Sequence, residues 1–280
     1  MTQQETNPNV PQKAAKTMVD ALEHPRTKER FEAVLKENAP AFMASIIDLY
    51  NGDNTLQNCQ PKQVVYEAMK AATLKLPVNK GLGFAYIVPY RTKNGYMATM
   101  QIGYRGYIQM AMRTGQYRII NADLVYEGEL DRKNKLTGEI SFAGDRESDK
   151  VVGYFAHFEL INGFAKTLYM TKDDIIRHAK KYSKSYSDKN SAWQTDFDAM
   201  AKKTVIRNLL SHYGFLTPDM ASAINDDLGP DTQQRDEQVK GKTGSKPLNI
   251  EDTPYEDVPG DNGHDAPEKE GDQPQRKPSF

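Results

Sequence analysis

The chain has 280 residues, which is enough for one large domain or two small ones. Its single cysteine, Cys59, excludes an intrachain disulfide, and no apolar run has the length of a membrane span or a signal peptide, so we expect a protein of a reducing compartment. Residues 1–60 carry 6 Lys/Arg and 8 Asp/Glu, residues 61–215 carry 24 and 15 (net +9), and residues 216–280 carry 7 and 15 (net −8).

The N-terminal part of the chain has a helical pattern behind a polar start. Residues 1–26 are polar and proline-containing, and we expect a flexible arm there. Apolar residues recur at helical spacing from Thr27, and Pro40 is expected to break or bend this helix. A turn at residues 51–54 precedes a second helix, predicted over residues 61–76.

The central part changes to the pattern of antiparallel strands. The dipeptides Asn94-Gly95 and Asn162-Gly163 are typical of tight hairpin turns, and Gly115 suits the end of a helix. We expect, in chain order, strands at 83–90 and 96–104, a helix at 105–115, a strand at 118–126, a small hairpin around 137–138, and strands at 151–161 and 164–170.

Helices return before the acidic end. Thr171 and Asp174 form a capping pattern for a helix that reaches residue 184, and a mobile segment is expected to follow it. A last helix is predicted over residues 192–212 and ends at Gly214.

The pattern as a whole predicts an α+β fold: N-terminal helices, then central antiparallel β-hairpins with helices packed on them. From residue 228 the composition is too polar and acidic to bury a core. We therefore divide the chain into a flexible arm (1–26), a binding and oligomerisation core (27–227) and a disordered acidic tail (228–280).

The sequence does not match the motifs of nucleotide-binding enzymes. Gly241-Lys242-Thr243 lacks the earlier glycine of a phosphate loop, because position 236 is Asp236. The glycines at 81 and 83 start a dinucleotide fingerprint, but its sixth position is Tyr86. The histidines are isolated, no nucleophile elbow occurs, and we expect no cofactor, no metal and no enzymatic activity.

One acidic cluster leaves nuclease activity open as an alternative function. Glu127, Glu129 and Asp131 alternate and would line one face of a strand, as magnesium-binding carboxylates do. A solvated loop edge is the favoured interpretation of this cluster.

Basic and aromatic side chains gather in the central region. Basic residues recur every three or four positions in the predicted helix after Thr171, and others lie opposite the apolar stripe of the last helix. Cations attract the phosphates of any sequence, and aromatic rings stack on any base, so the combination indicates nucleic-acid binding without sequence preference. Each cluster has an ordinary solvated helix face as its alternative, and the net +9 of residues 61–215 favours nucleic acid.

The side chains expected to contact nucleic acid are Arg91, Lys93, Tyr104, Arg105, Tyr107, Arg113, Arg118, Lys172, Arg177, Lys180, Lys181, Tyr182, Lys184, Trp193, Lys202, Lys203 and Arg207. In the last predicted helix, over residues 192–212, Lys202, Lys203 and Arg207 are expected to lie on the solvent side, away from Phe197. Gly103 and Gly106 let the backbone approach DNA closely, or they form a structural corner between a strand and a helix.

Three blocks of the chain resemble the RecT family of single-strand annealing proteins. They are GLGFAYIVPY (81–90), QIGYRGYIQMAMRTGQY (101–117) and AWQTDFDAMAKKTVIRNLL (192–210), in the order and spacing of the family. The IGYRG and MAKKT-x-x-R segments are the most specific. The resemblance covers residues 27–220 and is nearest to members from phages of Gram-positive bacteria.

The resemblance implies an ATP-independent protein that binds single-stranded DNA and anneals complementary strands in homologous recombination, in the cytoplasm of a bacterial host. It implies homo-oligomers in the form of rings or helical filaments, and two protein partners, a phage exonuclease and the host single-strand binding protein. The tail segment 248–260, with a few apolar residues among acids, is the candidate for contact with a partner.

Three alternatives stay open from the sequence. The first is a single-strand binding protein that does not anneal. The second is the phage nuclease that the acidic cluster at 127–131 suggests. The third is an assembly protein whose affinity for DNA is incidental.

Overall fold

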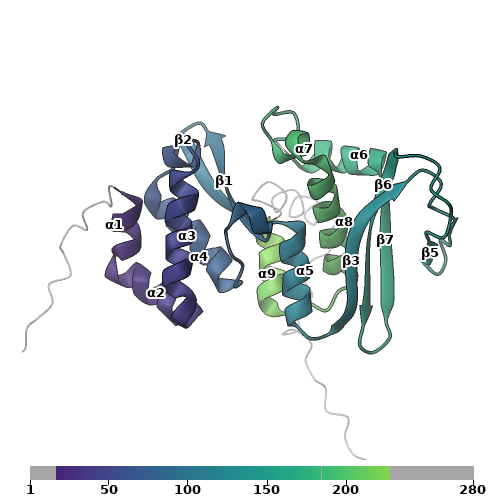
Figure 1. Ribbon diagram of the computed structural model, residues 1–280, viewed down its shortest axis with the longest axis horizontal. Helices are drawn as coiled ribbons and strands as arrows, with labels where there is room; N and C mark the ends of the chain where they lie inside the picture. Colours follow the sequence, from purple (N-terminus) through teal and green to yellow (C-terminus); the bar gives the residue numbers. More distant parts are fainter. Residues whose placement is uncertain (1–16, 184, 228–280) are drawn as a thin grey trace, which may run out of the picture. The chain divides into compact units, whose positions relative to one another are not determined.

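The computed structural model describes residues 17–183 and 185–227. Over this range helices and antiparallel sheets are mixed, which confirms the predicted α+β class (Figure 1). Lys184, residues 1–16 of the predicted arm and the predicted acidic tail lie outside the described residues. No helix within the described ranges is both long and apolar enough to cross a membrane.

The N-terminal layer is helical. It consists of α1 (Met18–Glu23), α2 (Pro25–Leu35), the 3-10 turn η1 (Lys36–Asn38), α3 (Ala39–Asn51), the 3-10 turn η2 (Leu56–Asn58) and α4 (Pro61–Thr73).

Helix α1 lies inside the segment that was expected to be a flexible arm. Thr17 and Asp20 form a capping box that starts it, and Met18 and Leu22 are buried in the core. Residues 18–23 of this segment are therefore helical and contribute to the core. The helical run is broken before Pro40, as expected, because α2 ends at Leu35 and α3 begins at Ala39. Pro40 lies in the first turn of α3, where an amide N–H has no helical partner.

A two-stranded sheet packs on α4. After the 3-10 turn η3 (Lys80–Leu82), strand β1 (Ala85–Thr92) pairs antiparallel with β2 (Gly95–Ile102), as predicted. Gly95 has a φ of 111°, which the tight turn requires. Buried Glu67 of α4 accepts a 2.7 Å hydrogen bond from the amide of Met100, which attaches the sheet to the helix.

A three-stranded sheet forms the second part of the core. Its strands are β3 (Tyr117–Tyr126), β6 (Val151–Leu160) and β7 (Ala165–Thr171), in the order β3-β6-β7. A small hairpin, β4 (Arg132–Lys133) with β5 (Ile140–Ser141), extends between β3 and β6 along the chain, as expected. Gly163, at a φ of 85°, confirms the Asn-Gly turn between β6 and β7.

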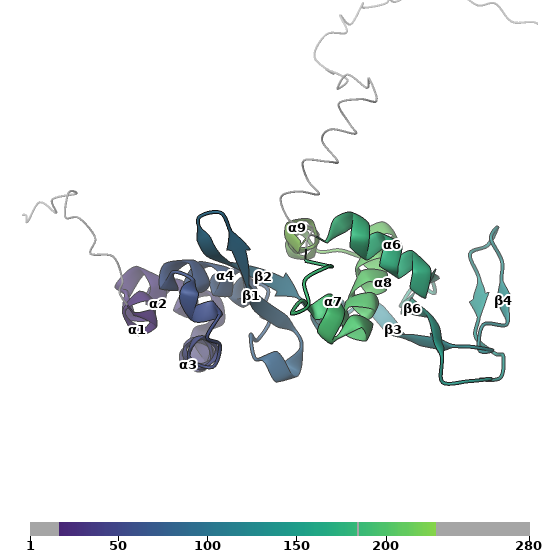
Figure 2. The ribbon, with the colours of Figure 1, turned by 90° about the horizontal axis from the view of Figure 1, so that it is seen from above.

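The remaining helices are α5 (Tyr104–Arg113), α6 (Lys172–Tyr182), α7 (Ala192–Thr195), α8 (Phe197–Tyr213) and α9 (Pro218–Asp227). Helix α8 packs across the three-stranded sheet and also contacts α5, α7 and α9 (Figures 1 and 2). The capping box of Thr171 and Asp174 starts α6 as predicted. Helix α8 thus contacts all three strands of this sheet and three of the other helices.

Two features of the C-terminal helices differ from the prediction. The expected helix over 192–212 is interrupted at Asp196, whose backbone leaves the helical region and whose carboxylate accepts a 3.1 Å bond from the amide of Ala199. Helix α9 was not predicted at all. Thr217 accepts from the amide of Met220 at its start, and Met220 and Ile224 are buried.

The glycines of the IGYRG segment form a structural corner. A Cβ atom at Gly103 would overlap the carbonyl oxygen of Gly83, and one at Gly106 would overlap that of Phe84. Both positions are buried between the start of β1 and the start of α5. Of the two interpretations left open by the sequence, the structure favours the strand-to-helix corner over close approach to DNA.

We predict that Gly106→Ala lowers the free energy of unfolding by about 1–3 kcal/mol, because the added methyl group must push the backbone at Phe84 aside. Gly81→Ala is the control, since no atom lies within 4 Å of the position that its added methyl group would take. Urea unfolding of both variants checks this, and equal stabilities would contradict the close-packed corner.

Candidate nucleic-acid interface

The first turn of α5 displays an aromatic ring with two cations beside it. The Nζ of Lys202, from α8, lies 4.8 Å from the centroid of the Tyr104 ring. The guanidinium of the exposed Arg105 lies 5.8 Å from the same centroid, and its Nε donates a 3.2 Å bond to the tyrosine hydroxyl. This arrangement brings together residues that are about a hundred positions apart in the chain.

Tyr86 of β1 extends this group, although it was not among the predicted contacts. Its hydroxyl and the side chain of Arg105 both lie against the backbone of Gly83. Burial, and then the charge of Asp196, raise the pKa of Tyr86. We call Tyr86, Tyr104, Arg105 and Lys202 the Tyr104 surface. The signal that could have found Tyr86 is its position in the resembling block 81–90, next to glycines that make the corner.

A second cluster, of charged and polar side chains, lies on the buried side of α5 and α8. The carboxylate of Asp227, at the end of α9, accepts bonds from the hydroxyl of Tyr107 (2.7 Å) and the amide of Ile102 (3.2 Å). Its oxygens lie 2.9 Å from the Nζ of Lys203 and 4.0 Å from the guanidinium of Arg207. We call these five residues the Asp227 network.

The Asp227 network is almost closed to solvent. The side chains of Lys203, Arg207 and Asp227 are 11%, 13% and 2% exposed, and Tyr107 is fully buried. Burial lowers the pKa of Lys203, and the carboxylate of Asp227 acts in the opposite direction. Burial also raises the pKa of Tyr107 well above its usual value.

The expected placement of Lys203 and Arg207 on a solvated helix face is therefore wrong. Lys202 is half-buried and reaches the Tyr104 ring, but its neighbour points inward because consecutive residues on a helix are turned by about 100°. A carboxylate that arrives from α9 stabilises the buried cations, and the sequence pattern of α8 alone contains no sign of it. Tyr107, likewise, offers no ring to a base in this conformation.

Three other candidates also have partners within the protein. Arg113 donates to the carbonyls of Leu74 (2.6 Å) and Lys75 (3.2 Å) at the end of α4, and Arg118 pairs with Glu159 on β6. Trp193 is 6% exposed and packs its ring against Phe197. These contacts within the protein explain the three residues as structural, and any contact that they make with DNA stays a prediction.

The remaining candidates are exposed but lie on different elements. Arg91 and Lys93 flank the turn between β1 and β2. On α6 the exposed residues are Arg177, which pairs with Asp174, together with Lys180, Lys181 and Tyr182. The Nζ of Lys181 lies 4.9 Å from the Tyr182 ring, and the Nζ of exposed Lys172 lies 5.8 Å from the Phe197 ring.

The acidic cluster that suggested a nuclease is engaged in local bonds. Glu127 binds Lys150 (2.8 Å) and Ser148 (2.9 Å), and Glu129 accepts from the amide of Tyr126 (2.7 Å). Lys150 and Ser148 lower the pKa of Glu127 through these bonds. Within residues 17–183 and 185–227, no group of three or more His, Cys, Asp or Glu side chains is placed to hold a metal ion.

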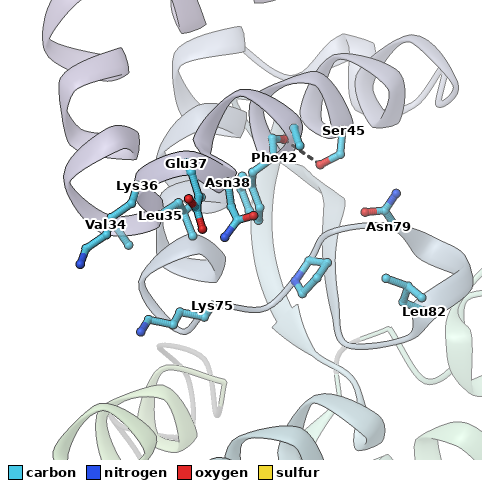
Figure 3. Close-up of a pocket in the computed structure, with 12 residues that line it drawn as sticks. Val34, Leu35, Lys36, Glu37, Asn38, Phe42, Ser45, Lys75, Asn79 and Leu82 are labelled. Atoms are coloured by element: carbon cyan, nitrogen blue, oxygen red, sulfur yellow. Dashed lines mark hydrogen bonds between the residues drawn. The ribbon is translucent and has the colours of Figure 1, made fainter.

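A pocket of about 810 Å³ lies between α2, α3 and the segment before η3 (Figure 3). Apolar side chains such as Val34, Phe42 and Leu82 line it together with Lys36 and Lys75. It shares no residue with the Tyr104 surface or with the Asp227 network.

The neighbouring lysines of α8 allow a matched test of this geometry. We predict that Lys203→Met lowers the free energy of unfolding by about 1–3 kcal/mol, because Asp227 loses its nearest cation while staying buried. Lys202→Met should cost less than about 1 kcal/mol, since it removes only a cation–π contact at the surface. Urea unfolding of the pair decides the matter, and equal losses would contradict the inward placement of Lys203.

A half-buried histidine near Arg207 predicts a pH dependence. Burial, and then the charges of Arg207 and Lys181, lower the pKa of His178 from 6.5 to about 4. Between pH 6.5 and about 4, His178 is therefore protonated in the unfolded chain but not in the folded chain. The free energy of unfolding falls as the pH drops through this range. His178→Gln should reduce this loss, whereas His212→Gln, at an exposed position, should not. Urea unfolding at several pH values checks it, and identical pH profiles for the wild type and His178→Gln would refute it.

Comparison with known proteins identifies the family. The RecT family model matches residues 40–240. The uncharacterized protein YqaK of Bacillus subtilis is 49% identical over 223 residues, which are 79% of this chain and 76% of YqaK. Protein RecT of Escherichia coli is 32% identical over 168 residues, which are 56% of this chain and 60% of that protein. Both the Tyr104 surface and the Asp227 network lie within the matched range, and the chain belongs to the RecT family.

Proposed function

We propose that this protein binds single-stranded DNA and anneals complementary strands during recombination, without nucleotide hydrolysis. Membership of the RecT family supports the role in single-strand annealing. The observation that carries the proposal is the Tyr104 surface, where an aromatic ring and the cations of Arg105 and Lys202 lie together on the corner made by the IGYRG segment.

The mechanism follows from the chemistry of these side chains. In this proposal, Arg105 and Lys202 attract backbone phosphates, and the half-buried ring of Tyr104, next to both cations, stacks on a base or a sugar, with Tyr86 beside it as a further candidate. A strand held by its backbone keeps its base edges available to a second strand. The free energy of pairing comes from the bases, and the protein reduces repulsion between the two backbones. The proposed role has no covalent step.

The wider surface and the partners belong to the proposal as well. The exposed basic residues of α6 and of the β1–β2 turn are proposed as further phosphate contacts. We also propose that the protein forms rings or filaments of identical subunits, receives single strands from an exonuclease, and contacts the single-strand binding protein of the host through residues 248–260.

An annealing assay tests the function against its alternatives. Two complementary labelled oligonucleotides are mixed with and without protein, in the absence of nucleotide and in the presence of EDTA. Faster pairing with the protein supports annealing. Slower pairing would identify a non-annealing binder, and cleavage of the labelled DNA after magnesium is added would identify a nuclease.

We predict that Lys202→Ala and Arg105→Ala weaken binding to single-stranded DNA and each reduce the slope of log affinity against log salt by about 0.7, the value for one phosphate contact. Tyr104→Ala should cost about 1–3 kcal/mol of binding free energy with less change of slope, because it removes stacking. Lys62→Ala, which removes the same charge from the exposed face of α4, is the control. Fluorescence anisotropy at several salt concentrations measures these effects. An equal loss in Lys62→Ala would mean that overall charge, and not this surface, attracts DNA.

A further inference from the structure

The Asp227 network contains two buried cations and one carboxylate. Lys203 lies 2.9 Å from the nearer oxygen of Asp227, but Arg207 only reaches 4.0 Å. The network therefore carries a net positive charge in a place where an unbalanced charge is costly. The nearby His178 does not add to it at neutral pH, because its pKa is held at about 4. Among residues 17–183 and 185–227, Asp227 is the only carboxylate within ion-pair distance of either cation.

The carboxylate comes from a helix that is less firmly held than its partners. Helix α9 has ten residues, and Met220, Ala223 and Ile224 are its buried side chains. Lys203, Arg207 and Tyr107 belong instead to α8 and α5, which pack against each other and against β3. The end of α9 can therefore leave while the cations stay in place.

The network lies directly behind the Tyr104 surface. Lys202 and Lys203 are consecutive on α8, and Tyr104 and Tyr107 are one turn apart on α5. A DNA strand that contacts Lys202 and Tyr104 thus passes over α8, which holds both buried cations, and over the start of α5, which holds Tyr107. A phosphate diester has one negative charge and two free oxygen atoms, so it offers Lys203 and Arg207 what the carboxylate of Asp227 offers them now.

We propose that Lys203 and Arg207 form a phosphate-binding site for single-stranded DNA, and that Asp227 occupies this site until a backbone phosphate displaces it. The end of α9 then acts as an internal competitor that opens on DNA binding. Phosphate oxygens can also accept the bonds that the Tyr107 hydroxyl and the Ile102 amide now give to Asp227. This proposal rests on the proposed function.

The first test compares two substitutions that remove the same charge from adjacent residues. Asp227→Asn keeps the shape of the side chain and removes the competing charge, whereas Asp226→Asn changes an exposed carboxylate that has no part in the network. The probe is fluorescent oligothymidylate bound to the full chain at several salt concentrations. We expect Asp227→Asn to bind at least about threefold more tightly than Asp226→Asn, with the same salt slope, because both complexes make the same phosphate contacts and only the competing carboxylate differs.

The second test needs no variant. Hydrogen exchange of the wild-type chain, with and without oligothymidylate, should show faster exchange of the amides in α9 when DNA is bound, and equal or slower exchange in α5 and α8. If Asp227→Asn does not fold, this measurement decides alone.

The outcomes separate the two proposals. A wild-type chain that fails to bind oligothymidylate would overturn the proposed function itself. A wild type that binds, with Asp227→Asn no tighter than Asp226→Asn or with α9 unchanged or more protected in the complex, would leave the function intact. In that case Asp227 would be a permanent structural partner of the two cations, and the inference would be wrong.

Discussion

The carboxylate of Asp227 is the point where four elements of the fold meet. It accepts from the last residue of β2, from a tyrosine of α5 and from a lysine of α8, and it stands at the end of α9. Without it, Lys203 and Arg207 would be buried with no other carboxylate of the described residues within ion-pair distance. This one buried interaction therefore attaches α9 to α5 and α8, the two helices that together build the Tyr104 surface.

The MAKKT-x-x-R segment then divides its basic residues between two tasks. Lys202 points outward to the Tyr104 ring, and Lys203 and Arg207 point inward to Asp227. The IGYRG segment divides its residues in the same way. Arg105 is exposed beside the half-buried Tyr104, while Gly103 and Gly106 allow the close contact with the backbone at Gly83 and Phe84 that fixes the corner. The two most specific blocks of the sequence are thus partners in one structure.

The sequence was sufficient for features that depend on local chemistry. Both Asn-Gly hairpins, the capping box of Thr171 and the alternation of helices with strands follow from neighbouring residues, and the structure confirms them. Helix α9 was within reach too, because Thr217 and Pro218 are a start signal and Met220, Ala223 and Ile224 follow at helical spacing. Helix α1 was missed although Thr17 and Asp20 form a capping box at its start.

Features that depend on contacts between distant residues could not be predicted from the sequence. The inward position of Lys203 is set by a carboxylate 24 residues later in the chain, and Tyr107 contacts the same carboxylate across 120 residues. A basic residue on an amphipathic helix is ordinarily a surface residue, and nothing near Lys203 in sequence signals the exception. The same limit applies to Arg113, whose partners are the carbonyls at the end of α4.

The most direct test of the central role of Asp227 is a double-mutant cycle on the free energy of unfolding, with Lys203→Met, Asp227→Asn and the double variant. We expect a coupling energy of about 1–3 kcal/mol between the two positions, since each substitution removes the same buried ion pair. A coupling energy near zero would show that the two side chains act independently. It would contradict the claim that this interaction holds α8 and α9 together.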